Sequence, residues 1–291
     1  MKTSSCYILL LVLIIVACQK KEKVESGYIQ AGGIKVYYES RGEGPAVLLL
    51  HAGLQDCRMW DAQLPALTGN HRVITVDLPA HGKTTGMDTT LLMEDVLAAV
   101  LDSLHIVKTS VIGLSYGSAS ATDLVLAYPK KIDKVILVSP GLTGWQDVLK
   151  PDSISLYYFT ALDSAFMKDD HTKTAALFTK AWCDGPFRTP EQVDSATRKY
   201  ILTTTLQNLQ QHTNDRWVSF AEETGADRAH TIENPVLIIY GDKDIPFIIE
   251  VSHFLNKSIA GSKEVMIPNV AHMLNMEAPE TFNKTITDFL K

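Results

Sequence analysis

The sequence contains few cysteines and no excess of positive charge, and each shortage excludes a class of protein. Four Cys among 291 residues are too few for a disulfide scaffold, and no Cys-x-x-Cys or His-Glu-x-x-His pattern indicates a zinc site. Lys and Arg number 27 against 33 Asp and Glu, so the chain lacks the basic excess that nucleic-acid binding requires. No apolar run reaches the roughly 20 residues that a membrane-spanning helix requires. The sequence therefore predicts no metal, no cofactor and no nucleic-acid partner.

The N-terminus has the pattern of a secretory signal followed by a lipid attachment site. Lys2 precedes an uncharged apolar run over 7–17, which predicts a signal peptide over 1–17. The end of this run, Ile-Val-Ala before Cys18, resembles a bacterial lipobox, in which the Cys is lipidated after cleavage; an ordinary cleaved signal is the alternative. Residues 18–26 then comprise the lipidated Cys and a charged tether. The resemblance implies an anchor in the bacterial cell envelope, and a Gln after the Cys favours the outer membrane. Which face the protein occupies, and its oligomeric state, are left open.

Only Cys57 and Cys183 remain as ordinary cysteines after this processing. They lie in different parts of the chain, and free cysteines are commonly buried like small apolar residues. Although the compartment is oxidising, the sequence favours two half-buried thiols over a disulfide between them.

Five nearly continuous apolar runs predict strands that are buried on both faces. Such strands belong to parallel sheets whose two faces are covered by helices. Ahead of them, two alternating runs over 28–31 and 34–39 flank Gly32-Gly33, which predicts an antiparallel hairpin. The five predicted buried strands cover residues 46–50, 73–76, 109–114, 134–139 and 235–240.

Helical patterns alternate with these strands. Apolar residues at helical spacing predict helices over 91–104, 117–127 and 278–290. Thr89 and Thr90 are the N-cap candidates for the first of them. Alternation of strands and helices is typical of a doubly wound α/β sheet.

A long interval interrupts this alternation. Residues 140–234 carry helical patterns without a convincing strand, although a crossover between two strands needs far fewer residues. The interval therefore predicts a helical cap inserted into an α/β core, whose two parts cover residues 27–139 and 235–291.

The sharpest local motif is Gly113-Leu114-Ser115-Tyr116-Gly117, between a predicted strand and a predicted helix. In this context a G-x-S-x-G sequence is typical of a nucleophile elbow, a tight turn that exposes the Ser hydroxyl at the carboxyl end of a sheet. The flanking glycines provide the small residues that such a turn needs. Because a neutral hydroxyl is a poor nucleophile, Ser115 requires a base, and the base requires an orienting acid.

A candidate base and a candidate acid follow in the later part of the chain. His272 lies after a β-like run over 264–268, and Asp244 directly follows the strand predicted over 235–240. The order Ser, Asp, His is the order found in hydrolases with a nucleophile elbow. Asp242, in the same turn as Asp244, is the second candidate for the acid.

From about residue 28 to its end, the chain resembles the α/β-hydrolase superfamily in its elbow, its Gly-Asp-Lys-Asp turn and the loop before its last helix. The resemblance implies the α/β-hydrolase fold and a triad of Ser115, Asp244 and His272. It also implies two backbone donors for an oxyanion. One is the N–H of Tyr116, at a helix N-terminus, and the other comes from the loop after the first buried strand.

That loop reads HAGLQDCRMW and resembles the His-Gly loop of the same superfamily. The residue after His-Gly donates its N–H there, which implies Gly53 as the second donor. Ala52 stands where the superfamily usually has Gly, so Leu54 is the alternative. His51 and His81 are interpreted as structural residues.

The aromatic content of the cap points to an apolar substrate. The cap carries more aromatic residues than its own core needs, and the surplus can line a pocket over Ser115. Leu54, Trp145 and Trp182 are the candidate substrate-binding residues. The sequence predicts a serine hydrolase of a small ester, thioester or lactone that works through an acyl-enzyme. C–C bond hydrolysis, peptide hydrolysis or cofactor-free perhydrolysis by the same triad is the alternative, and a non-catalytic binding protein is a third hypothesis.

Overall fold

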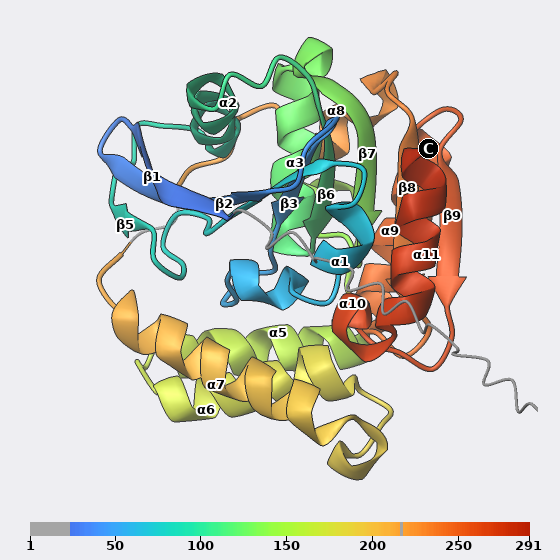
Figure 1. Ribbon diagram of the computed structural model, residues 1–291. Helices are drawn as coiled ribbons and strands as arrows, with labels where there is room; N and C mark the ends of the chain where they lie inside the picture. The colour runs from blue at the N-terminus through green and yellow to red at the C-terminus, as the bar shows by residue number, and fades with distance from the viewer. Residues whose placement is uncertain (1–23, 216–217) are drawn as a thin grey trace, which may run out of the picture.

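The computed structural model describes residues 24–215 and 218–291, which form one sheet with helices on both of its faces (Figure 1). The predicted signal peptide, Cys18 and the first residues of the predicted tether lie outside the described residues. No helix in the described ranges is long and apolar enough to cross a bilayer.

Within the described chain, nine strands form a single sheet in the order β1-β2-β4-β3-β6-β7-β8-β9, and the short β5 pairs with β2. Neighbouring strands are parallel from β4 to β9, whereas β1, β2 and β4 are antiparallel. The predicted hairpin is confirmed, with Ala31 opposite Ile34 at its turn. The strands are β1 (Glu25–Ala31), β2 (Ile34–Arg41), β3 (Ala46–Leu50), β4 (Arg72–Val76), β5 (Thr85–Gly86), β6 (Thr109–Leu114), β7 (Ile132–Val138), β8 (Val236–Gly241) and β9 (Lys263–Ile267).

Strand β1 begins before residue 27, the predicted start of the core. It starts at Glu25, within the segment that the sequence assigns to a tether. Pairing with β2 holds this segment in the sheet, and the hydroxyl of Tyr38 donates to the carboxylate of Glu25. Cross-strand partners thus extend the strand into a sequence with little strand propensity of its own.

Helices cover both faces of the sheet, which confirms the predicted doubly wound arrangement. Helices α2, α3 and α9 pack on one face, and α1, α10 and α11 pack on the other. Successive residues of β3 alternate between these two cores: Leu48 faces the first and Leu49 the second. The helices are α1 (Leu64–Leu67), α2 (Met93–Ser103), α3 (Tyr116–Ala127), α4 (Trp145–Val148), α5 (Ser153–Phe166), α6 (His171–Phe178), α7 (Ser195–Gln211), α8 (Gly225–Arg228), α9 (Pro246–Ser258), α10 (Leu274–Glu277) and α11 (Pro279–Leu290), with short helical turns η1 (Cys57–Trp60) and η3 (Thr179–Asp184).

The N-cap predicted for α2 is wrong. The helix begins after Leu92, whose side chain makes no capping hydrogen bond. The Thr90 hydroxyl donates instead to the carboxylate of Asp88. The first N–H of the helix, that of Met93, donates to the carbonyl of Ser219. A backbone carbonyl from a distant segment therefore satisfies the donor that a capping side chain was expected to satisfy.

Between β7 and β8 the chain leaves the sheet and forms helices α4 to α8, in residues 140–234, termed the cap segment. Helices α5, α6 and α7 lie side by side below the sheet in Figure 1, beyond the carboxyl ends of the parallel strands. The loops that leave those strand ends therefore face the cap segment.

Cys57 and Cys183 are free thiols, as predicted, and both are buried rather than half-buried. Burial raises the pKa of Cys183 to about 12, so this thiol stays protonated and behaves as a small apolar residue.

Candidate active site

Ser115 stands at a strained turn between β6 and α3. Its backbone φ is +56°, in the left-handed region that residues other than glycine rarely adopt. A Cβ on Gly113 would lie 2.1 Å from the carbonyl oxygen of Gly117, and a Cβ on Gly117 would lie 2.2 Å from that of Leu50. Both positions therefore require glycine, and the turn has the shape of a nucleophile elbow.

His272 and Asp244 meet at the same edge of the sheet. Asp244 follows β8 and His272 follows β9, and both side chains are buried. His272 Nδ1 lies 2.8 Å from Asp244 Oδ2. Asp244 Oδ1 accepts the N–H of Ile245 at 2.7 Å, which fixes the orientation of the carboxylate. Asp242, the second candidate acid, is engaged elsewhere because its carboxylate accepts the N–H of Asn269.

Ser115 and His272 line the same cavity, termed the inner cavity, which has a volume of about 520 Å³. Trp182 from η3 packs against the imidazole of His272, with ring centroids 4.4 Å apart. Trp145 packs on Phe247 with centroids 4.8 Å apart. Both tryptophans predicted to bind substrate therefore lie in the wall of this cavity. Its lining also includes Gly53, Tyr116, Phe159, Phe178, Phe220, Ile248 and Val251.

The loop after β3 brings a candidate backbone donor to the inner cavity. Gly53 lines the cavity together with Tyr116, the first residue of α3. The N–H of Leu54, the alternative donor, donates to His81 Nε2 at 2.9 Å, so the geometry favours Gly53. His51 Nε2 accepts a backbone N–H from the turn after β4. Burial lowers the pKa of both imidazoles, which keeps them neutral and able to accept these bonds.

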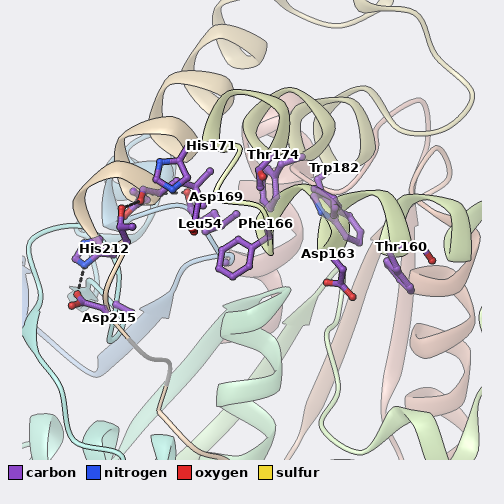
Figure 2. A pocket seen from close by; sticks show the side chains of 18 of the residues that line it. Leu54, Thr160, Asp163, Phe166, Asp169, His171, Thr174, Trp182, His212 and Asp215 are labelled. Carbon is purple, nitrogen blue, oxygen red and sulfur yellow. Dashed lines mark hydrogen bonds and ion pairs between the residues drawn. The ribbon is translucent and has the colours of Figure 1, made fainter.

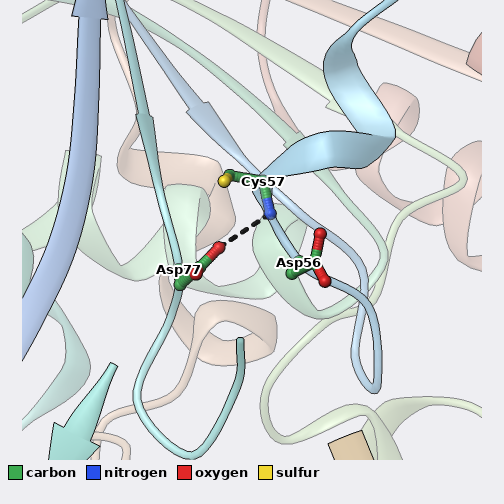
Figure 3. A group of neighbouring side chains, drawn as sticks. All are labelled: Asp56, Cys57 and Asp77. Carbon is green, nitrogen blue, oxygen red and sulfur yellow. Dashed lines mark hydrogen bonds between the residues drawn. The ribbon is translucent and has the colours of Figure 1, made fainter. Parts of the chain in front are cut away.

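Asp56, Cys57 and Asp77 form a buried group beside the same loop (Figure 3). Their ligand atoms lie within 4.8 Å of one another. Each carboxylate already has protein donors. Asp77 accepts the N–H of Cys57 at 2.8 Å and that of Lys83 at 2.7 Å. Asp56 accepts from the guanidinium of Arg58 at 2.6 Å. The group therefore fastens the loop after β3 to the turn after β4.

A second cavity of about 930 Å³, termed the outer cavity, lies among the helices of the cap segment (Figure 2) and shares part of its wall with the inner one. Leu54, the third predicted substrate-binding residue, lines the outer cavity together with Trp145 and Trp182, and it is not among the lining residues of the inner cavity. The residues that line both cavities are Gly53, Trp145, Phe159, Phe178 and Trp182.

The polar residues of the outer cavity belong to no sequence motif. They come from α5, from α6 and the turn before it, and from α7 and the region that follows it. His212 Nδ1 lies 2.6 Å from Asp215 Oδ2, and Figure 2 shows this pair at one end of the cavity. The ionisable side chains among its described lining residues are Asp163, Asp169, His171, His212 and Asp215.

Arg188 holds the end of η3, the turn whose Trp182 packs against His272. Its guanidinium donates to the carbonyls of Cys183 and Asp184, both at 2.7 Å. Carbonyls at a helix end lack partners within the helix, and the guanidinium satisfies two of them. Because these carbonyls belong to the two residues directly after Trp182, the bonds restrict where its ring can lie.

The same guanidinium reaches the loop that carries His272. Arg188 Nη1 donates to Glu277 Oε2 at 2.6 Å and to the carbonyl of Asn269. Glu277 Oε1 accepts the N–H of Ala271, directly before His272, at 2.9 Å. Burial raises the pKa of Glu277, and the neighbouring guanidinium opposes that rise. Arg188 and Glu277, termed the clasp, thus join the cap segment to the loop of His272.

Known proteins resemble this chain over most of its length. The profile of the alpha/beta hydrolase fold family matches residues 45–279. A 2-hydroxy-6-oxo-6-(2'-aminophenyl)hexa-2,4-dienoic acid hydrolase from Metapseudomonas resinovorans is 26% identical, over 94% of this chain and 94% of its own. A pimeloyl-[acyl-carrier protein] methyl ester esterase from Nitrosospira multiformis is 23% identical, over 89% of this chain and 100% of its own.

A solved structure of an esterase from Thermogutta terrifontis has the same fold. It superposes with a TM-score of 0.75 at 22% identity, over 91% of this chain and 98% of its own. The parallel sheet, the helices on its two faces and the match to the family profile agree with one another. The chain therefore belongs to the α/β-hydrolase family.

Proposed function

We propose that the chain is a serine hydrolase of a small ester, thioester or lactone. Ser115 Oγ attacks the carbonyl carbon of the substrate while His272 Nε2 accepts the hydroxyl proton. The N–H groups of Gly53 and Tyr116 stabilise the oxyanion that forms. His272 then gives its proton to the departing alcohol or thiol, which leaves an acyl-enzyme. Water, deprotonated by His272, then attacks the acyl carbon. The bond between this carbon and Ser115 Oγ breaks, His272 returns the proton to Oγ, and the acid is released.

The observation that carries this proposal is the buried contact between His272 and Asp244, beside a cavity that Ser115 also lines. A carboxylate at Nδ1 keeps a proton on that nitrogen, so Nε2 can accept the proton of the hydroxyl. The same carboxylate stabilises the imidazolium that results. Backbone strain at Ser115 supports the assignment, since strained residues cluster at active sites.

Hydrolysis of a C–C bond by the same three residues is the second candidate. The Metapseudomonas relative is named as a hydrolase of a dienoic acid, whereas the Nitrosospira relative is named as a methyl ester esterase. A dienoic acid carries a carboxylate, which needs a cationic partner when it is buried. The described lining of the inner cavity contains no Lys or Arg, and this favours an ester.

Hydrolysis of p-nitrophenyl esters by the full-length chain tests the proposal. We expect turnover with an optimum of kcat/KM among acyl groups from acetate to laurate, because the inner cavity limits the length of the acyl chain. A fluorophosphonate probe is expected to label the chain at Ser115. A folded chain that neither turns over any ester nor takes up the probe would instead be a binding protein. The predicted lipid on Cys18 would place this reaction at a membrane of the bacterial cell envelope.

Replacement of Arg188 by Met is expected to lower kcat by about 10- to 100-fold, since small displacements of reacting groups have costs of this order. Met keeps much of the volume but removes every donor of the clasp. The pKa of Glu277 then rises further, so its carboxylate becomes protonated at a higher pH than in the unmodified chain. The acid limb of the pH profile of kcat is therefore expected to move to higher pH.

Replacement of Arg198 by Met is the matched control for Arg188. Arg198 Nε donates to Asp184 Oδ1 at 2.8 Å, so it belongs to the same part of the cap segment. Its ion pair is with Asp184 and not with the loop of His272. We expect the acid limb of the pH profile of kcat to lie at the same pH in this variant as in the unmodified chain. An equal shift of the acid limb in both variants would contradict a positioning role for the clasp.

A further inference from the structure

We propose that the site selects substrates whose acyl group carries no negative charge and rejects those whose acyl group ends in a carboxylate. The inference rests on the proposed ester hydrolysis at Ser115 and narrows its substrate class. It rests on the side chains that line the two neighbouring cavities, which share five residues of their walls, and on the partners that the nearby cations of the cap segment already have.

The inner cavity offers no partner to a carboxylate. Among its described lining residues there is no Lys, Arg, Asp or Glu, and His272 is its one ionisable side chain other than the phenol of Tyr116. Most of the remaining wall is aromatic or aliphatic. An ionised carboxylate that leaves water for such a wall loses its hydration without gaining a counter-charge, which costs several kcal/mol. An uncharged acyl chain gains free energy from the same apolar contacts.

The outer cavity repels a carboxylate rather than merely failing to bind it. Asp163, Asp169 and Asp215 contribute carboxylates to its described lining, which contains no Lys or Arg. His171 and His212 are the other ionisable groups, and His212 is already in contact with Asp215. Figure 2 shows these side chains distributed along the cavity. An acyl group that extends from Ser115 into this space therefore meets negative charge.

The cations of the neighbouring cap turn are committed to other partners. Lys180 Nζ donates to the carbonyls of Gly185 and Arg188. The guanidinium of Arg188 belongs to the clasp, and Arg198 pairs with the fully buried carboxylate of Asp184. None of these three side chains is among the residues that line either cavity. Among the residues that the structure describes, carboxylates therefore set the charge of the cavity walls.

Three esters of matched length test this selection with the full-length chain. They are p-nitrophenyl hexanoate, p-nitrophenyl hydrogen adipate, which ends in a carboxylate, and methyl p-nitrophenyl adipate, in which that carboxylate is masked. We expect kcat/KM for the acid to be at least about 30-fold below that for its methyl ester, because the charge is buried unpaired. The hexanoate and the methyl ester should be comparable. A smaller difference between acid and methyl ester overturns the selection, whereas hydrolysis of none of the three overturns the proposed function itself.

Adding a cation to the cavity wall tests whether charge is the cause. Gln146, an exposed residue of α4, lines the inner cavity, and Gln146→Lys is expected to raise the acid-to-methyl-ester ratio of kcat/KM by about tenfold. Thr281→Lys adds the same charge on an exposed position of α11, outside both cavities, and is expected to leave the ratio unchanged. Equal ratios in the two variants overturn the electrostatic selection.

Discussion

Replacement of Ser115 by Ala is expected to lower kcat for p-nitrophenyl hexanoate by about 10⁵-fold or more, as loss of an essential nucleophile does in serine hydrolases. The hydroxyl is the only group that the substitution removes. Ala has the same Cβ as Ser, so the backbone strain at φ +56° is unchanged and the elbow is retained. Steady-state kinetics on the purified variant, with circular dichroism to show that it is folded, measure the effect.

Replacement of Ser164 by Ala is the control for this experiment. Ser164 is an exposed residue of α5 in the cap segment, and its hydroxyl lines neither cavity. We expect that variant to keep its kcat and to be labelled fully by a fluorophosphonate, whereas the Ser115 variant is not labelled. Retention of labelling in the Ser115 variant would show that another nucleophile reacts with the probe and would remove Ser115 from the mechanism.

The central strands were the most predictable part of the fold. The runs over 46–50 and 109–114 coincide with β3 and β6, because a strand covered on both faces is apolar at every position. Strand β5 (Thr85–Gly86) was not predicted, since two exposed residues carry no periodicity. The start of β1 at Glu25 was not predicted because pairing with β2, and not local propensity, decides where this strand begins.

The candidate site likewise contains residues that the sequence predicts and residues that it does not. Ser115, Asp244 and His272 each lie in a loop that follows a parallel strand, and the carboxyl ends of such strands meet at one edge of a sheet. Strand prediction is therefore sufficient to bring these three residues together. Arg188 differs because it bonds to Asn269 and Glu277, which lie 81 and 89 residues away. Such contacts depend on how the cap helices pack on the core. Neither Arg188 nor Glu277 stands in a sequence pattern that predicts the contact between them.

Replacement of Asp244 by Asn is expected to lower kcat by about 10⁴-fold, the cost of presenting the base in the wrong tautomer. An Asn amide group can donate to His272 Nδ1, which places the proton of the imidazole on Nε2. That nitrogen then cannot accept the proton of Ser115. The nearly isosteric change leaves the packing of this buried position intact. Thermal unfolding is therefore expected to show that the variant is folded, so that the loss is confined to kcat.

Replacement of Asp242 by Asn separates the two acids of the turn. The Asp242 carboxylate accepts the N–H of Asn269 in the loop before His272, and an Asn side chain keeps an oxygen that can accept the same bond. We therefore expect kcat to fall by less than about tenfold. If the Asp242 variant lost as much activity as the Asp244 variant, the hydrogen bond at 2.8 Å between Asp244 and His272 would not be the contact that sets the tautomer of the base.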